Sequence, residues 1–110
     1  MTRIVFADEK VKKALDRLKE TPSEKRLYDS IMRAFRDIEE SPTAFIHIRQ
    51  RLIPREYVVK YGIDNLWKYD LPNGWRLLYS LGKSEIEIIA IILEWLDHKS
   101  YERRFGYRKR

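Results

Sequence analysis

Apolar residues recur every three or four positions across the first third of the chain. This spacing places them on one side of a helix and predicts two amphipathic helices, separated by a break at Thr21-Pro22-Ser23-Glu24. The first helix should run from an Asp8 cap to about Glu20, and the second should end at Ser41-Pro42. Together they predict a helical hairpin with one apolar side. Its apolar positions are Val11, Ala14, Leu15 and Leu18 in the first helix and Leu27, Ile31, Phe35 and Ile38 in the second.

The spacing changes to two, as in strands, at the start of the chain and again after residue 65. Thr2–Phe6 predicts a short first strand. Leu66–Leu71 and Trp75–Leu81 predict two more strands, joined by the turn residues Pro72-Asn73-Gly74. A further turn is expected at Gly82-Lys83. The β-branched run that follows, from Ile86 to Leu93, is typical of a buried central strand.

The segment between these two halves, residues 41–64, shows neither spacing clearly. Pro54 and Gly62 predict the start and the end of one short helix. We interpret the rest as a connector that could contact a partner. His47 is expected to be partly exposed and to have no role. The segment also carries Arg49, Arg51 and Arg55.

The order of these elements predicts one α+β domain spanning residues 1–110. An N-terminal strand and a helical hairpin would pack on one face of a mainly antiparallel four-stranded sheet. A short charged segment would follow the last strand. The opposite face of the sheet is expected to stay free for function.

The amino-acid composition excludes several classes of protein and of binding site. With 44% hydrophobic and 36% charged residues, the chain has enough apolar material to fold. It has no cysteine, and its two histidines, His47 and His98, are too few for a typical zinc site, so no metal or cofactor is expected. No run approaches the roughly 20 apolar residues of a membrane span, and the start MTRIVFADEK has no apolar signal core. A cytoplasmic protein is therefore expected.

Positive charge is concentrated near the C-terminus. From His98 onward, six basic residues accompany only one acidic residue, which gives +5 of the net charge of +6. A nearly neutral body with a cationic end suits attraction to a polyanion such as nucleic acid. A solvated terminal segment without a partner would have the same composition. The six basic residues are Lys99, Arg103, Arg104, Arg108, Lys109 and Arg110.

Alternation along the strand Trp75–Leu81 separates an apolar face from a face that carries Arg76. An arginine within a strand is better placed to hold a phosphate than to be buried in a core. The structural alternative is that Arg76 pairs with Glu85 or Glu87 across the hairpin.

Two segments of the chain resemble the RelE/ParE toxins. Leu66–Tyr79 contains a Trp67-Lys68-Tyr69 strand and the strand Gly74-Trp75-Arg76-Leu77-Leu78-Tyr79, as in that family. Ile88–Tyr107 is an apolar strand that leads into Asp97-His98-Lys99-Ser100-Tyr101, which is similar to the family's closing motif. The order of elements resembles the family over nearly the whole chain. The resemblance implies a RelE-like fold and a toxin that a cognate antitoxin neutralises.

The RNA-cleaving branch of that family cuts mRNA in the ribosomal A site without a metal, by attack of a ribose 2′-hydroxyl on the neighbouring phosphate. This chemistry needs cations for the developing charge and groups that exchange protons. The resemblance implies that Arg76 holds the scissile phosphate and that His98 or Tyr101 exchanges protons. Histidine suits that role better, because imidazoles as a class titrate near neutral pH. The residues implied to bind nucleic acid are Lys68, Lys99, Arg103 and Arg104.

These residues also have structural interpretations. Lys68 could be a solvated strand residue, and His98 an ordinary surface histidine. Tyr101 and Phe105, four residues apart, could pack a last helical turn onto the sheet.

Two positions differ from the family's pattern. Asp70 stands where some members carry a second lysine, and Lys99 stands where arginine is common. These differences leave two other functions open. One is inhibition of DNA gyrase, as in the ParE branch, and the other is a non-catalytic basic nucleic-acid-binding domain.

Overall fold

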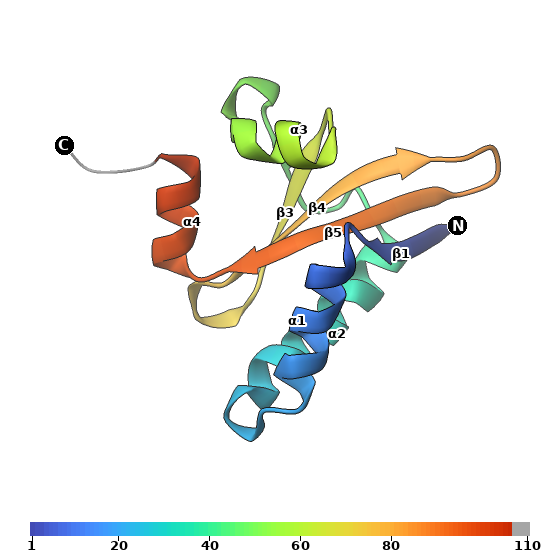
Figure 1. Ribbon diagram of the computed structural model, residues 1–110. Coiled ribbons are helices and arrows are strands. Elements are labelled where there is room, and N and C mark those ends of the chain that lie inside the picture. Colours follow the sequence, from blue (N-terminus) through green and yellow to red (C-terminus); the bar gives the residue numbers. More distant parts are fainter. Residues whose placement is uncertain (107–110) are drawn as a thin grey trace.

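The structure is a computed structural model that describes residues 1–106 (Figure 1). Within these residues, helices cover both faces of a five-stranded mixed sheet, so the fold is α+β. Only the last part of the predicted charged end, Tyr107 and Arg108 to Arg110, lies outside the described residues. The strands are β1 (Thr2–Phe6), β2 (Ile46–Ile48), β3 (Leu66–Asp70), β4 (Arg76–Lys83) and β5 (Ile88–Leu96). The helices are α1 (Glu9–Lys19), α2 (Lys25–Glu40), α3 (Arg55–Tyr61) and α4 (His98–Phe105).

The predicted helical hairpin is confirmed as α1 and α2. Asp8 caps α1, because its Oδ1 accepts a hydrogen bond of 3.0 Å from the backbone N–H of Val11. Both helices bury their apolar stripes against one face of the sheet, which we call the hairpin face. Burying each of the larger side chains contributes about 1.5–3 kcal/mol. The fully or nearly buried residues of this core are Val11, Leu15, Ile31, Ala34, Phe35, Ile38, Leu71, Leu77, Tyr79, Ala90 and Ile92.

The strands are ordered β1-β5-β4-β3-β2. β1 runs parallel to β5, and the other neighbours are antiparallel. The prediction of four strands is wrong for the described residues, because the connector contributes β2 as a fifth strand. β2 pairs with β3 through Ile46 opposite Lys68 and Ile48 opposite Leu66. With three residues, of which Ile46 and His47 are exposed, β2 is too short to show a clear alternation.

The hairpin between β4 and β5 also differs from the prediction. Gly82 and Lys83 lie within β4, and the turn is formed by residues 84–87. The Ser84 hydroxyl accepts hydrogen bonds from the backbone N–H groups of Ile86 and Glu87, which fixes this turn. Ile86 is therefore a turn residue and is 86% exposed, although it is apolar. The predicted strand began two residues too early for this reason.

The second face of the sheet was expected to be free, and this prediction is wrong. Figure 1 shows α3 and α4 on the side opposite α1 and α2. The apolar run of β5 supplies side chains to both faces, which is typical of a strand buried on both sides. Helices must cover the second face because its strand residues are apolar. The buried residues of this smaller core are Ile48, Tyr57, Ile63, Leu66, Leu78, Leu93, Leu96 and Tyr101.

A β-bulge in β5 determines which residues reach the second face. Leu78 is opposite Glu94, whereas Tyr79 is opposite Ile92, so Leu93 is an extra residue between the two pairs. Without the bulge, Glu94 would share a face with Ile92. Its pairing with Leu78 instead turns it toward the second face.

Within residues 1–106, no helix has both the length and the apolar character needed to cross a membrane.

A partly buried hydrogen bond ties the sheet to the helical hairpin and should make stability depend on alkaline pH. The Tyr69 hydroxyl donates to Asp37 Oδ2 at 2.5 Å. Burial, together with this hydrogen bond to a carboxylate, raises the pKa of Tyr69 from 10.0 to about 12. The folded state therefore holds the proton more tightly than the unfolded state. The stability that results is fully present below pH 10 and is lost between about pH 10 and 12.

We expect Tyr69→Phe to lose less stability than the wild type over that pH range. Urea unfolding at a series of pH values from neutral to 12 measures this difference. At neutral pH the variant should be the less stable protein, because it lacks the hydrogen bond to Asp37. Parallel loss of stability in the two proteins above pH 10 would contradict the assignment.

Candidate functional site

Two cations that the sequence pointed to, Lys68 and Arg76, meet on the second face of the sheet. They lie on neighbouring strands, and Asp70 pairs with Arg76 across the β3–β4 hairpin. Asp70 Oδ1 is 3.3 Å from Lys68 Nζ and 3.3 Å from Arg76 Nε. The side chains of Lys68 and Arg76 are only 17% and 18% exposed, whereas Asp70 is 53% exposed. One accessible carboxylate thus holds two partly desolvated cations.

Helix α4 places the ring of Tyr101 against the same two cations. Lys68 Nζ is 5.2 Å from the ring centroid, and Arg76 Cζ is 5.0 Å from it. At these distances the electron-rich face of the ring attracts both charges. Tyr101 is 6% exposed, so it also belongs to the core beneath α4. We call Lys68, Asp70, Arg76 and Tyr101 the cation cluster.

The Arg76 guanidinium has hydrogen-bonding capacity that the described residues do not use. One terminal nitrogen donates to the backbone carbonyl of Gly74. Its Nε is buried and has no hydrogen-bond partner in the described part of the chain. The 3.3 Å contact between Nε and Asp70 lacks the geometry of a hydrogen bond. A buried donor left without an acceptor is costly. An anion that displaced Asp70 with better geometry would remove this cost.

Helix α4 begins next to this cluster and carries His98 in its first turn. The Asp97 carboxylate caps the helix by accepting from the backbone N–H of Ser100 at 2.8 Å, and this hydrogen bond lowers the pKa of Asp97. The His98 side chain is 59% exposed, and its Nε2 is 3.3 Å from Glu102. A Cβ at Gly74 would lie 3.3 Å from His98 Cβ and 3.9 Å from Arg76 Nη1. His98 and Arg76 therefore flank the same turn.

Gly74 is the residue that permits this close approach, and its replacement should be destabilising. Its φ angle is +79°, a region that other residues rarely adopt, and a side chain would press on His98. We expect Gly74→Ala to lower the free energy of unfolding by about 1–3 kcal/mol. Gly82→Ala is the matched control, since a Cβ there meets only Ile91 at 3.9 Å. Urea unfolding should show a clearly larger loss for Gly74→Ala, and equal losses would contradict the geometry.

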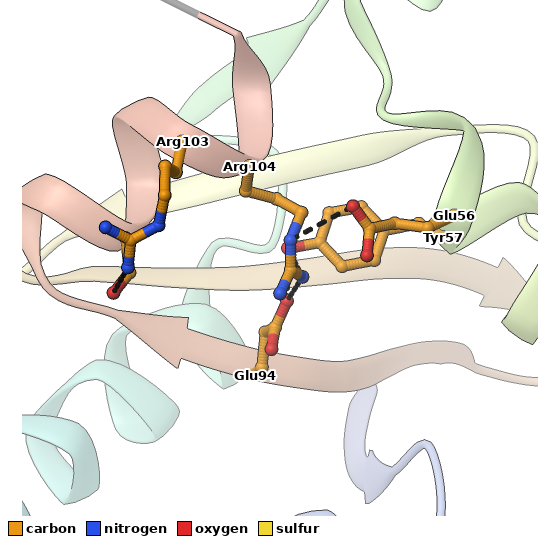
Figure 2. A network of polar contacts seen from close by, with 6 residues as sticks. Glu56, Tyr57, Glu94, Arg103 and Arg104 are labelled. Carbon is orange, nitrogen blue, oxygen red and sulfur yellow. Dashed lines mark hydrogen bonds and ion pairs between the residues drawn. The ribbon is translucent and has the colours of Figure 1, made fainter.

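Arg104 lies apart from the cation cluster, in a separate network that Figure 2 shows. Its Nε is 3.1 Å from Glu56, and its Nη1 binds Glu94 and the Tyr57 hydroxyl. The Tyr57 hydroxyl donates to Glu94. Burial first, and then this hydrogen bond, raise the pKa of Tyr57. The guanidinium predicted to bind nucleic acid is therefore already paired within the chain, and it joins α4 to α3 and β5.

The other two predicted nucleic-acid ligands on α4 are exposed. Arg103 points away from the Arg104 network in Figure 2, and its Nη2 donates to Ser100 Oγ at 3.4 Å. Lys99 lies in the first turn of the helix and is also exposed. These positions suit contact with a solvent-accessible polyanion.

The alternative pairing of Arg76 with Glu85 or Glu87 is wrong. Arg76 lies at the start of β4 opposite Leu96, far along the hairpin from the turn that holds both glutamates. Glu87 instead accepts from Arg3 at 2.9 Å. The register across Pro72-Asn73-Gly74, which places Asp70 opposite Arg76, was the signal that sequence reasoning did not use.

The network around Glu94 was not predicted from the sequence. A signal existed, since Glu94 is the one charged residue in the strand Ile88–Leu96. Its partners come from α3 and α4, and no local pattern connects those segments. Among residues 1–106, no three histidine, aspartate or glutamate side chains gather in a group that could hold a metal ion.

No known protein family, curated protein or solved structure matches this chain.

Proposed function

We propose that this chain is the toxin of a toxin-antitoxin system and a RelE-like mRNA interferase, which cleaves mRNA in the ribosomal A site without a metal. The observation that carries the proposal is the cation cluster. It gathers Lys68, Arg76 and Tyr101, three of the residues that the family resemblance implies, on one sheet face beside the start of α4. Two partly desolvated cations are suited to a phosphate.

In the proposed reaction, the scissile phosphate takes the place of the Asp70 carboxylate between Lys68 and Arg76. The ribose 2′-hydroxyl loses its proton and attacks the phosphorus, and the 5′-oxygen leaves with a proton, so a 2′,3′-cyclic phosphate and a free 5′-hydroxyl are formed. The two cations stabilise the extra negative charge of the pentacoordinate transition state. His98 is the exposed group proposed to exchange protons, and Tyr101 holds the cations in place.

Mapping of mRNA ends after induced expression tests this function. The wild type should produce new 5′ ends inside translated codons of an abundant mRNA, as primer extension detects them. The Arg76→Ala/His98→Ala variant should produce none while accumulating as a folded protein. Growth arrest without new ends would reject the nuclease function.

A specific observation favours inhibition of DNA gyrase as the second candidate. Asp70 already pairs with both cations, whereas an RNA-cleaving site needs them for phosphate. This candidate predicts DNA-damage signalling with intact transcripts and no dependence on His98. Under either toxin function, the expected partner is a cognate antitoxin. A basic nucleic-acid-binding domain without toxicity would instead depend on Arg108 to Arg110.

Replacing Asp70 tests the nuclease candidate directly. In the nuclease, Asp70→Asn removes the carboxylate that competes with phosphate, so cleavage should rise by up to about tenfold. Stability should fall, because Lys68 and Arg76 then repel each other without a counter-charge. Single-turnover cleavage on programmed ribosomes measures the rate, and Asp16→Asn, an exposed change on α1, is the control. Cleavage that falls with Asp70→Asn would mean that the carboxylate itself takes part in the reaction.

A further inference from the structure

A row of stacked rings crosses the hairpin face of the sheet and ends at its edge. The rings of Tyr79 and Trp67 stack with centroids 6.4 Å apart, and the imidazole of His47 stacks on Trp67 at 4.3 Å and 14°. His47 belongs to the edge strand β2 and is exposed. The row therefore ends in an accessible ring, on which another planar ring could stack.

A groove begins beside this row, on the same face of β3. Tyr69, two residues after Trp67, forms part of its wall and packs on Phe45 with centroids 4.7 Å apart. Residues two apart on a strand lie about 7 Å from each other. The groove has a volume of about 690 Å³. It lies between α2 and the end of β3, and its lining also includes Asp29, Ser30, Arg33, Arg36 and Asp70.

The charges in this groove leave a surplus of positive charge. Asp29 pairs with Lys25 at 3.3 Å, and Asp70 pairs with Lys68 and Arg76. Arg33 and Arg36 are exposed, and within residues 1–106 neither makes an ion pair with a carboxylate. The two carboxylates are thus already compensated, while the two guanidinium groups remain to bind an anion. Guanidinium groups bind phosphate oxygens well.

We propose that the groove and the His47–Trp67 stack bind single-stranded RNA, with phosphates on Arg33 and Arg36 and a base on His47. Sequence-tolerant binding of single strands combines cations along the backbone with aromatic rings under the bases, and both are present here. Asp70, at the end of β3, contributes to both the groove and the cation cluster. Because the two lie on opposite faces of the sheet, a strand in the groove would pass around the end of β3 to reach the proposed cleavage site. The inference deepens the proposed function and names the surface for the rest of the substrate strand.

Binding of a short, labelled oligouridine with 2′-O-methyl riboses tests this surface. The probe has no 2′-hydroxyl to attack, so fluorescence anisotropy reports binding without cleavage. Arg33→Gln/Arg36→Gln should weaken binding about tenfold and reduce the slope of log affinity against log salt by about 1.4, because two phosphate contacts are lost. Lys12→Gln/Lys13→Gln, an equal loss of charge at exposed positions of α1, is the matched control and should bind nearly as the wild type does.

Variants of His47 test the proposed stacking of a base on the His47 ring. His47→Ala should weaken binding about tenfold, whereas His47→Phe, which keeps a ring on Trp67, should restore it. Circular dichroism of each variant checks that the sheet is intact.

Three results would overturn the inference. The first is that the wild type does not bind oligouridine, and the second is that the groove and α1 variants lose equal amounts of affinity. The third is that polyglutamate competes for the surface as well as RNA does, which would indicate an acidic peptide as the ligand. The proposed cleavage can fail separately. Groove-dependent binding together with intact mRNA in induced cells would support the surface and reject the nuclease.

Discussion

Replacing Arg76 by alanine should lower the rate of the proposed mRNA cleavage by about 10²–10³-fold, the usual effect of removing one charge-stabilising donor from a transition state. The size of the effect follows from the position of the guanidinium. The Arg76 side chain is 18% exposed, its guanidinium lies against the Tyr101 ring, and its Nε lacks a hydrogen-bond acceptor in the described residues. A charge that is shielded from water acts more strongly on a developing charge than an exposed one does.

The loss should be confined to the reaction. Lys68 and Asp70 still pair in the variant, so the free energy of unfolding should fall by only about 1 kcal/mol. Arg76→Lys separates charge from geometry, because lysine keeps the charge but cannot make two parallel hydrogen bonds to a phosphate. We expect an intermediate rate for it. Lys83→Ala, at the exposed far end of the same strand, is the control and should cleave at the wild-type rate.

Single-turnover cleavage on ribosomes stalled with an empty A site measures these rates. If Arg76→Ala cleaved as fast as the control, the cation cluster would be a structural feature of the second core. The gyrase function would then be the one to test, since it does not require a phosphate at Arg76.

Local patterns predicted the helical hairpin and the faces of β4 well, because each depends on a repeat along one segment. Arg76 and Leu78 on one side, with Leu77 and Tyr79 on the other, follow directly from strand alternation. Lys68 and Arg76 could be placed together because the turn Pro72-Asn73-Gly74 connects their strands. The alternative pairing of Arg76 with Glu85 or Glu87 was wrong, although the same turn sets the register with Asp70.

The features that escaped prediction depend on contacts between distant segments or on local irregularity. β2 has three residues, so its pairing with β3 is visible only in the fold. The covering of the second face follows from the packing of α3 and α4, which the sequence indicated only as a short helix and a possible helical turn. The position of Glu94 depends on one extra residue, Leu93, and strand alternation gives the opposite face for it.

Glu94→Ala should lower the free energy of unfolding by about 2–3 kcal/mol, the largest stability effect that we expect from a single polar side chain. Tyr57 is only 2% exposed, and the variant leaves its hydroxyl without the carboxylate that accepts its hydrogen bond. It also leaves Arg104 with Glu56 and the Tyr57 hydroxyl, so the guanidinium loses one of its two carboxylate partners in the described residues. The side chains of Glu94 and Arg104 are 30% and 28% exposed, so the loss is smaller than for a fully buried pair. Glu87→Ala is the control, because Arg3 is 56% exposed and that pair should contribute less than about 1 kcal/mol.

Glu94→Ala should also slow the proposed reaction. Its combined effect on stability and cleavage distinguishes the Glu94 network from the cation cluster. Arg104 anchors α4 to α3 and β5, and α4 carries both Tyr101 and His98. Glu94→Ala should therefore reduce stability and cleavage together, whereas Arg76→Ala should reduce cleavage with only a small loss of stability. Glu94→Leu/Arg104→Leu removes both charges, so urea unfolding should show a smaller loss than the sum of the two single changes. Additive losses, or full activity in Glu94→Ala, would mean that α4 is held over the sheet by its apolar contacts without help from this network.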